Sequence, residues 1–223
     1  MSAAASLELH RLPTSLLRSE LRARLAACAA GGAPRVSHYA GVPPLRLEAL
    51  MPVAPAHAAV LVPIVDRGEE LSVLLTLRAA DLAQHAGQIS FPGGRLESGD
   101  ADATAAALRE AREEIGLDSG FVEVLGRLPD HAVISGYRVT PVVALVRPGF
   151  SLLLDPTEVA GTFEAPLRHL LDPATRTRRR RSFAGEEIEF LDLPWGQFNI
   201  WGATAGMLFT LRDVLGGAPV HGD

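Results

Sequence analysis

Runs of apolar positions separated by polar segments predict a group of β-strands in the middle of the chain. Two apolar, β-prone runs cover His57 to Val65 and Leu71 to Leu77, and the polar residues 66 to 70 between them predict a hairpin. The next predicted strands cover Phe121 to Leu128 and Tyr137 to Val146. Between these two strands we expect a loop that holds Asp130, His131 and Ser135.

The same pattern predicts helices before, between and after the strands. Helix-forming residues fill Ala101 to Ile115, and Gly116 marks the expected end of that helix. A second helix is predicted from Ser15 to Ala30, ending at Gly31-Gly32. Its apolar stripe consists of Leu17, Leu21 and Leu25. A third helix follows Phe198 to Ala205 and continues through Leu215.

These elements predict one α/β domain with an N-terminal extension. Strands mixed with one long helix, and a second helix near the end, favour a layered α/β arrangement. Residues 33 to 56 are rich in proline and predict an irregular linker. We therefore divide the chain into residues 1–56, a helix with its linker, and residues 57–223, the main domain. The first helix is expected to pack on the main domain or at a homodimer contact.

Composition and charge narrow the class of protein and its expected cellular compartment. The 223 residues are 48% hydrophobic, enough to bury a full core, and the net charge of -5 offers no basic footprint for nucleic acid. A single cysteine, Cys28, excludes an internal disulfide framework. No apolar run near the N-terminus is long enough for a signal peptide, and prolines break the longest uncharged run, Ala49 to Val65. We expect a cytoplasmic protein that does not enter membranes.

Three glutamates on the central predicted helix point to metal chemistry. Glu110, Glu113 and Glu114 are i, i+3 and i+4 neighbours, and we expect them opposite an apolar stripe. That stripe consists of Leu108, Ala111 and Ile115. Like charges so close repel one another unless a cation lies among them. A hard divalent cation with oxygen ligands is therefore the predicted occupant.

The surrounding residues agree with a metal site. Arg109 precedes Glu113 by four positions, where its fork would orient a carboxylate. Gly93 and Gly94 follow a β-like run at residues 88 to 91, and they allow the backbone to approach a ligand closely. A carbonyl there, that of Gly94 for instance, is a candidate further metal ligand.

This stretch resembles the Nudix box, G-x5-E-x7-R-E-U-x-E-E-x-G-U, where U is aliphatic. The matching residues are Gly94, Asp100, Arg109, Glu110, Ala111, Glu113, Glu114, Gly116 and Leu117. Asp100 replaces the first glutamate of the box, and eight residues instead of seven separate it from Arg109. The resemblance implies an α/β/α sandwich with a mixed sheet and a catalytic site that uses Mg²⁺ or Mn²⁺.

A second stretch resembles the coenzyme A diphosphatase branch of that family. Residues 74 to 94 follow L-L-T-x-R-[SA]-x3-R-x3-G-x3-F-P-G-G, except that Ala83 stands where the motif has its second arginine. In this stretch Arg78 would meet a phosphate or pair with a helix carboxylate. His85 and Gln88 flank Gly87, where they would contact the substrate or serve as ordinary loop hydrogen-bonding groups.

Two later segments supply further candidates. By the resemblance, an acid from a late loop completes the metal site or acts as the base, and Glu158 is the candidate; otherwise it caps a local turn. Residues 176 to 188 predict a hairpin arm with a basic run at Arg178 to Arg181. Such runs are commonly solvated, but a substrate with several phosphates could use this one.

The resulting functional prediction is hydrolysis of a diphosphate bond by metal-activated water. The resemblance narrows the substrate to coenzyme A or its thioesters, giving (acyl-)4'-phosphopantetheine and adenosine 3',5'-bisphosphate. The alternatives are another small nucleotide-type substrate, such as ADP-ribose or NADH, and a catalytically silent ligand-binding regulator. Silent domains usually lose a box carboxylate, whereas Glu110, Glu113 and Glu114 are all present here.

Overall fold

The computed structural model describes residues 8–28, 35–36, 55–80, 87–133, 136–183 and 186–216. The helices are η1 (Leu9–Arg11), α1 (Thr14–Ala27), α3 (Ala103–Ile115), η2 (Ser119–Phe121), α4 (Leu167–Leu171), η3 (Pro173–Thr175) and α5 (Gly202–Gly216). The strands are β1 (Arg35–Val36), β2 (Ala56–Asp66), β3 (Leu71–Arg78), β4 (Ile89–Ser90), β5 (Gly93–Arg95), β6 (Val122–Arg127), β7 (His131–Val133), β8 (Tyr137–Val146), β9 (Val159–Pro166), β10 (Thr177–Phe183), β11 (Glu186–Trp195) and β12 (Phe198–Ile200).

A mixed sheet forms the centre of the molecule. β2 and β3 make the predicted antiparallel hairpin, and β2 also pairs in parallel with β8 over its length. Within the described residues the sheet has nine strands, with β1-β7-β8-β2-β3-β4 as its main order. β5 extends the β3 side of β2, while β6 and β9 pair with β8 and β3. The predicted mixed sheet is confirmed.

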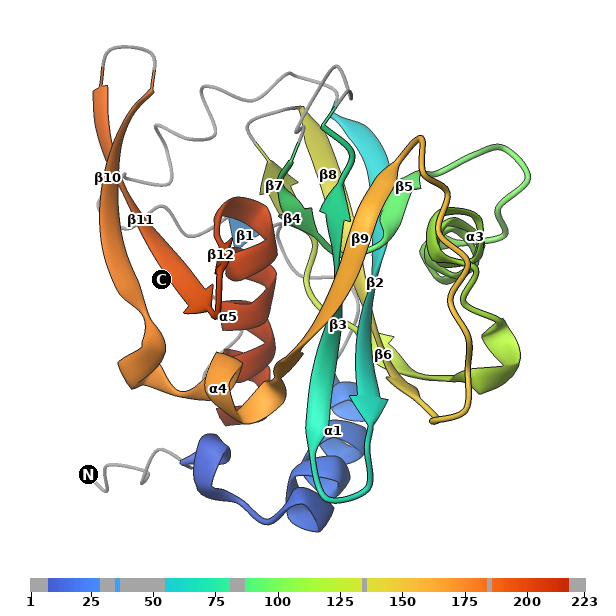
Figure 1. The fold of residues 1–223 in the computed structure, drawn as a ribbon, viewed down its shortest axis with the longest axis horizontal. Coiled ribbons are helices and arrows are strands. Elements are labelled where there is room, and N and C mark those ends of the chain that lie inside the picture. Colours follow the sequence, from blue (N-terminus) through green and yellow to red (C-terminus); the bar gives the residue numbers. More distant parts are fainter. Residues whose placement is uncertain are drawn as a thin grey trace.

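Helices cover both faces of this sheet, as Figure 1 shows with α3 on one side and α5 on the other; α1 packs against α5 and β6. Two clusters of buried residues fill the two interfaces. One joins the sheet to α1 and α5, and includes Leu21 and Leu208; the other joins the sheet to α3, and includes Ala107. The predicted α/β/α sandwich is therefore confirmed, because each helix layer buries its apolar side on one sheet face.

The N-terminal helix α1 packs on the same chain. Leu17, Leu21 and Leu25 are fully buried, as their spacing predicts. Gly126 of β6 lies so close to this helix that a Cβ there would be 2.6 Å from the Leu25 carbonyl oxygen. The helix ends at Ala27, three residues before the predicted end, because the backbone of the next residue is extended. Residues 29–34, with the predicted glycine stop, lie outside the described part. The homodimer stays a prediction.

Two predicted irregular segments contain strands instead. In the expected loop of Asp130 and His131, residues His131–Val133 form β7, because antiparallel pairing with β8 satisfies their backbone groups. Ser135 lies outside the described residues. Within the expected linker, Arg35–Val36 form β1 beside β7, and β2 begins at Ala56. The remaining linker residues that precede Pro55 are not described.

The C-terminal elements follow the predicted order. β10 and β11 form the expected hairpin arm, and β12 leads into α5. In Figure 1 this arm extends on the side of the molecule opposite α3. No helix in the described ranges is long and apolar enough to cross a bilayer.

Candidate active site

Capping residues set both ends of helix α3. The Asp102 side chain accepts a hydrogen bond from the Ala105 N–H at 2.9 Å, so the helix begins at Ala103 and not at the predicted Ala101. It ends as predicted at Gly116, whose φ of 67° is left-handed and favours glycine. The side facing the sheet is lined by small residues, which bring the helix backbone close to the strands. They are Ala103, Ala106, Ala107 and Ala111.

Two glycines of strand β5, Gly93 and Gly94, lie where this strand packs against α3. A Cβ on Gly93 would lie 2.6 Å from Val60 Cα in the neighbouring strand β2. A Cβ on Gly94 would lie 2.5 Å from the Glu110 carboxyl carbon. The Glu110 carboxylate thus occupies the space that any larger residue at position 94 would fill.

The Glu114 carboxylate is buried against the same strand. Its side chain is 3% exposed, and its Oε2 accepts a hydrogen bond from the Gly93 N–H at 3.1 Å. Arg78 at the end of β3 places Nη1 3.8 Å from Glu114 Oε1. Burial raises the pKa of Glu114 to about 7, and repulsion from Glu158 and Glu110 adds to this, while Gly93 and Arg78 oppose it.

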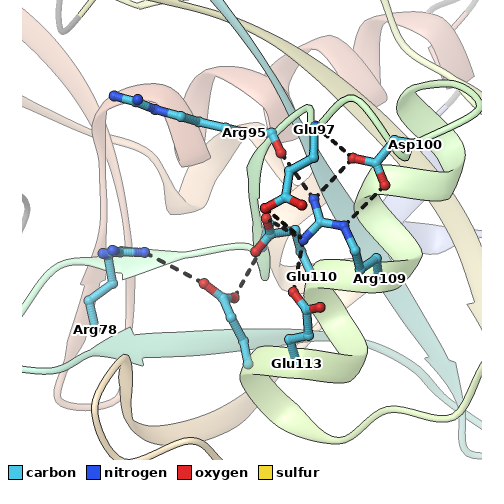
Figure 2. Close-up of polar contacts among 9 residues, drawn as sticks. Arg78, Arg95, Glu97, Asp100, Arg109, Glu110 and Glu113 are labelled. Atoms are coloured by element: carbon cyan, nitrogen blue, oxygen red, sulfur yellow. Dashed lines mark hydrogen bonds and ion pairs between the residues drawn. The ribbon is translucent and has the colours of Figure 1, made fainter.

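Arg109 lies at the centre of the remaining carboxylates, as Figure 2 shows. Its Nε and Nη2 each donate to the Asp100 carboxylate at 3.0 Å, which gives a bidentate pair. Nη1 donates to Glu110 at 3.0 Å and to Glu113 at 2.8 Å, and Nη2 also reaches the Arg95 carbonyl at 3.1 Å. These bonds lower the pKa of Asp100 and raise that of Arg109.

Glu110 is affected in the opposite direction from Asp100. Burial raises the pKa of Glu110, and repulsion from Glu113 and Glu158 adds to the rise, although Arg109 partly offsets it. Negative charge is therefore disfavoured on Glu110 and on Glu114. Both side chains face the strand of glycines, so a cation bound at this point would stabilise their ionised forms.

The loop between β8 and β9, residues 147–158, brings a further acid to the site and is called the Glu158 loop below. The Leu153 N–H donates to the Ile115 carbonyl at 3.0 Å, and the Asp155 N–H donates to the Glu114 carbonyl at 2.9 Å. Glu158 follows; its carbonyl accepts from the Ala79 N–H at 2.8 Å, next to Arg78. The Glu158 side chain is exposed, and its charge is close enough to raise the pKa values of two α3 glutamates.

Comparison with known proteins agrees with this geometry. The sequence profile of the NUDIX domain matches residues 55–189, which hold strands β2 to β9 of the sheet and α3. The chain belongs to the NUDIX domain family. It is 41% identical over 171 residues to Nudix hydrolase NudL of Cronobacter sakazakii, covering 73% of this chain and 84% of that protein. It is 40% identical over 163 residues to NudL of Escherichia coli K12, with the same coverage.

A solved Nudix structure supports the fold. The Nudix hydrolase RenU from M. smegmatis superposes with a TM-score of 0.51, covering 76% of this chain and 91% of that protein. Its sequence identity of 22% is low, so the likeness concerns the arrangement of the sheet and helices.

The Nudix box residues predicted from the sequence are brought together in space. Figure 2 shows Arg78, Arg109, Glu110 and Glu113 on adjoining elements. Gly93 and Gly94 of β5 and the Glu158 loop adjoin them. Gln88 lies beside Arg78, and its carbonyl accepts from the Arg78 N–H at 3.0 Å. His85 and Ala83 lie outside the described residues.

One predicted placement is wrong. The three glutamates were expected on one face opposite the apolar stripe, but Glu114 is buried whereas Glu113 is 59% exposed. At about 100° per residue, position 114 lies only about 60° from the buried Ala111. Glu114 therefore lies at the edge of the sheet-facing side, where the bare backbone of Gly93 leaves room for its carboxylate.

The sequence prediction also missed two relationships in the Nudix site. Asp100 was matched only as a substituted box position, whereas it is the bidentate partner of Arg109. The pairing of Arg95 with Tyr137, whose hydroxyl accepts from Arg95 Nε at 2.9 Å, was not anticipated. The acid nine positions before Arg109 is a signal for the first. No local spacing connects positions 95 and 137.

Proposed function

We propose that this Nudix protein hydrolyses the diphosphate bond of coenzyme A or its thioesters with a divalent cation. The observation that carries the proposal is the position of Glu110 and Glu114 against the two glycines of β5. A diphosphate carries negative charge that repels water or hydroxide, so its cleavage needs concentrated positive charge near phosphorus. A site of crowded carboxylates provides this by holding cations.

The donor set suits Mg²⁺ or Mn²⁺. Within the described residues, no three acidic, histidine or cysteine side chains converge as a ready-made cage. Arg109 instead bridges Glu110 and Glu113. All the donors are oxygens, and the raised pKa values of Glu110 and Glu114 fall when a cation binds. Glu110, Glu113, Glu114 and the Gly94 carbonyl would hold the ion, which supplies charge neutralisation and a lower pKa for attacking water.

Arg109, Arg78 and Glu158 have distinct roles in the proposal. Arg109 positions the glutamates through its bonds to Asp100, Glu110 and Glu113.

Arg78 meets a phosphate oxygen. Its buried Nε has no hydrogen-bond partner within the described structure, so one strong donor is available at the end of β3. Glu158 is the candidate general base, because it is exposed, acidic and near Glu110 and Glu114.

The coenzyme A assignment is supported by the match of residues 74 to 94 to the coenzyme A diphosphatase motif. Of the motif residues, Arg78 ends β3, which pairs with β4, and Gly93 and Gly94 begin β5, which packs against α3. Such an arrangement also fits ADP-ribose or NADH, which contain the same diphosphate link. A substrate comparison therefore decides between them.

The test is a screen of coenzyme A, acetyl-coenzyme A, ADP-ribose and NADH with Mg²⁺ and with Mn²⁺. Products are identified by chromatography and mass spectrometry. The proposal predicts the highest kcat/KM on coenzyme A or its thioester, with adenosine 3',5'-bisphosphate as a product. Glu110→Gln should lose most activity, whereas the matched control Glu123→Gln on β6, which pairs with Arg22, should keep it.

Three outcomes would overturn parts of the proposal. Faster turnover of ADP-ribose or NADH would replace the coenzyme A assignment but keep the reaction. No hydrolysis of any diphosphate would favour a ligand-binding regulator. Full activity in Glu110→Gln would move the reaction away from α3.

A further inference from the structure

Arg95 is the last residue of β5, and its side chain is held by a phenol. Its Nε and Nη2 donate to the Tyr137 hydroxyl oxygen at 2.9 and 2.5 Å. Tyr137 begins β8, two strands away, and the guanidinium crosses β2 to reach it. The small residues Ala56 and Ala58 occupy β2 at this point, opposite Tyr137 and Arg95 respectively, and leave the path open.

The backbone carbonyl and the side chain of Arg95 make their contacts on opposite faces of the sheet. Its carbonyl accepts from Arg109 on the α3 side at 3.1 Å. Arg95 pairs with Ala58 of β2, which pairs in turn with Val139 of β8. Ala58 and Val139 belong to the core between the sheet and helices α1 and α5, so the Arg95 side chain lies on that face. Figure 2 shows the Arg95 guanidinium directed away from Arg109 and Glu110, on the same side of them as Arg78.

Arg95 also differs from its neighbours in charge pairing. Arg109 binds several carboxylates, and Arg138, next to Tyr137, pairs with Asp130. Both side-chain hydrogen bonds of Arg95 in the described structure go to a neutral hydroxyl, and the side chain is exposed. Its positive charge is therefore held in place without being neutralised by a carboxylate. A planar fork in this state suits a phosphate group.

We infer that Arg95, positioned by Tyr137, binds an anionic group of the substrate that lies beyond the diphosphate. This inference rests on the proposed function, in which the diphosphate lies at the α3 carboxylates. Because the guanidinium points away from those carboxylates, it meets a different part of the substrate. The 3'-phosphate of coenzyme A is the group with that chemistry.

The arginine run of the hairpin arm is a poorer candidate for this contact. Arg178 to Arg180 are exposed on β10, and Figure 1 places that strand on the far side of the molecule from α3. Arg95, by contrast, is bonded through its own backbone to Arg109 in the site. The phosphate contact that the sequence suggested for the run is therefore assigned to Arg95.

The kinetic test compares coenzyme A with dephospho-coenzyme A in the full-length protein. The unmodified enzyme should prefer coenzyme A by roughly tenfold in kcat/KM, mainly through KM, as expected for one charge-assisted contact. Arg95→Met should remove most of this preference, while its backbone carbonyl remains available to Arg109. Arg95→Lys should retain part of the preference, and Tyr137→Phe should weaken it. The control Arg22→Met removes one exposed charge from α1 and should preserve it.

A binding measurement separates this inference from the proposed reaction. Calorimetry without metal compares adenosine 3',5'-bisphosphate with adenosine 5'-monophosphate. Tighter binding of the bisphosphate, lost in Arg95→Met, would support the inference even if neither coenzyme is hydrolysed. Equal binding of the two ligands by the unmodified protein would overturn it. A preference that survives Arg95→Met, or an equal loss of kcat/KM on both coenzymes, would also overturn it.

Discussion

Helices α1 and α3 pack on opposite faces of one sheet, yet they use their charges differently. On α1, each of two arginines pairs across to a carboxylate of the sheet layer: Arg18 with Asp66 and Arg22 with Glu123, both at 2.8 Å. These pairs border an interface of fully buried leucines. The charges of α1 are thus neutralised one to one, and the helix serves to complete the fold.

On α3, carboxylates outnumber their cationic partners. Arg109 is shared among Asp100, Glu110 and Glu113, while the cationic partner of Glu114 within the described residues is Arg78, at 3.8 Å. Alanines in place of leucines bring this helix close to the sheet, so that acidic side chains reach β5. This difference supports the proposed metal site on α3, where an excess of negative charge is held close to the glycine backbone of β5.

The largest expected effect on the structural side comes from Leu21→Ala. Leu21 is fully buried between α1 and the sheet, so the substitution should lower the free energy of unfolding by about 2–5 kcal/mol. Urea unfolding measures this, with Leu16→Ala as the control, because Leu16 on the same helix is 53% exposed. The folded variant should keep its kcat. A loss equal to that of the control would contradict the packing of α1.

On the functional side, Glu114→Gln should reduce kcat by roughly a hundredfold or more, because Glu114 is a proposed metal ligand and loss of a direct ligand exceeds the loss of an outer partner. The melting temperature without metal should not fall, since glutamine has nearly the same shape and removes a buried charge. The matched control is Glu20→Gln on α1, which pairs with Arg24. Near-normal kcat in Glu114→Gln would contradict the site.

The raised pKa of Glu114 predicts how stability depends on pH. Between its ordinary value of 4.5 and about 7 in the folded protein, the folded state binds a proton that the unfolded state has lost. Stability of the metal-free protein should therefore decrease as pH rises through this window, by about 1.4 kcal/mol per unit of pKa displacement. Urea unfolding at several pH values in EDTA should show a shallower decrease for Glu114→Gln. Parallel curves would disprove the shift.

The smallest effect is expected for Arg22→Ala. Its pair with Glu123 is exposed on both sides, so the free energy of unfolding should fall by only about 0.2–1 kcal/mol. Raising the salt concentration should reduce the difference further. A loss as large as that of Leu21→Ala would mean that α1 is held by charge and not by its leucines.

Much of the fold follows from local sequence signals. The strand at Tyr137–Val146 and the end of α3 at Gly116 lie where the apolar pattern and the glycine predict them. Local signals failed where pairing decided the structure. β7 forms because β8 offers a partner to residues 131–133, although a loop was expected between the two predicted strands.

For the candidate site, the sequence predicted which residues lie near one another better than it predicted their arrangement. Spacing along α3 identified Glu110, Glu113 and Glu114, but their separate environments depend on how the helix approaches β5. The burial of Glu114 follows from the absence of a side chain at Gly93, which lies in another element. The Arg95 and Tyr137 pair depends on the lateral order of β5, β2 and β8, which no local pattern encodes.

At the left-handed turn of Gly116, the end of α3 lies in close backbone contact with the Glu158 loop. A Cβ at position 116 would lie 2.8 Å from the Leu153 nitrogen, a backbone atom that cannot rotate away. Gly116→Ala would therefore require a shift of the loop backbone at Leu153 or of the end of α3, and the left-handed φ would strain the new residue. A shift of the loop would move the segment that leads to Glu158. Because the charge of Glu158 contributes to the raised pKa of Glu114, this displacement would retune the acidity of a buried carboxylate from outside the site.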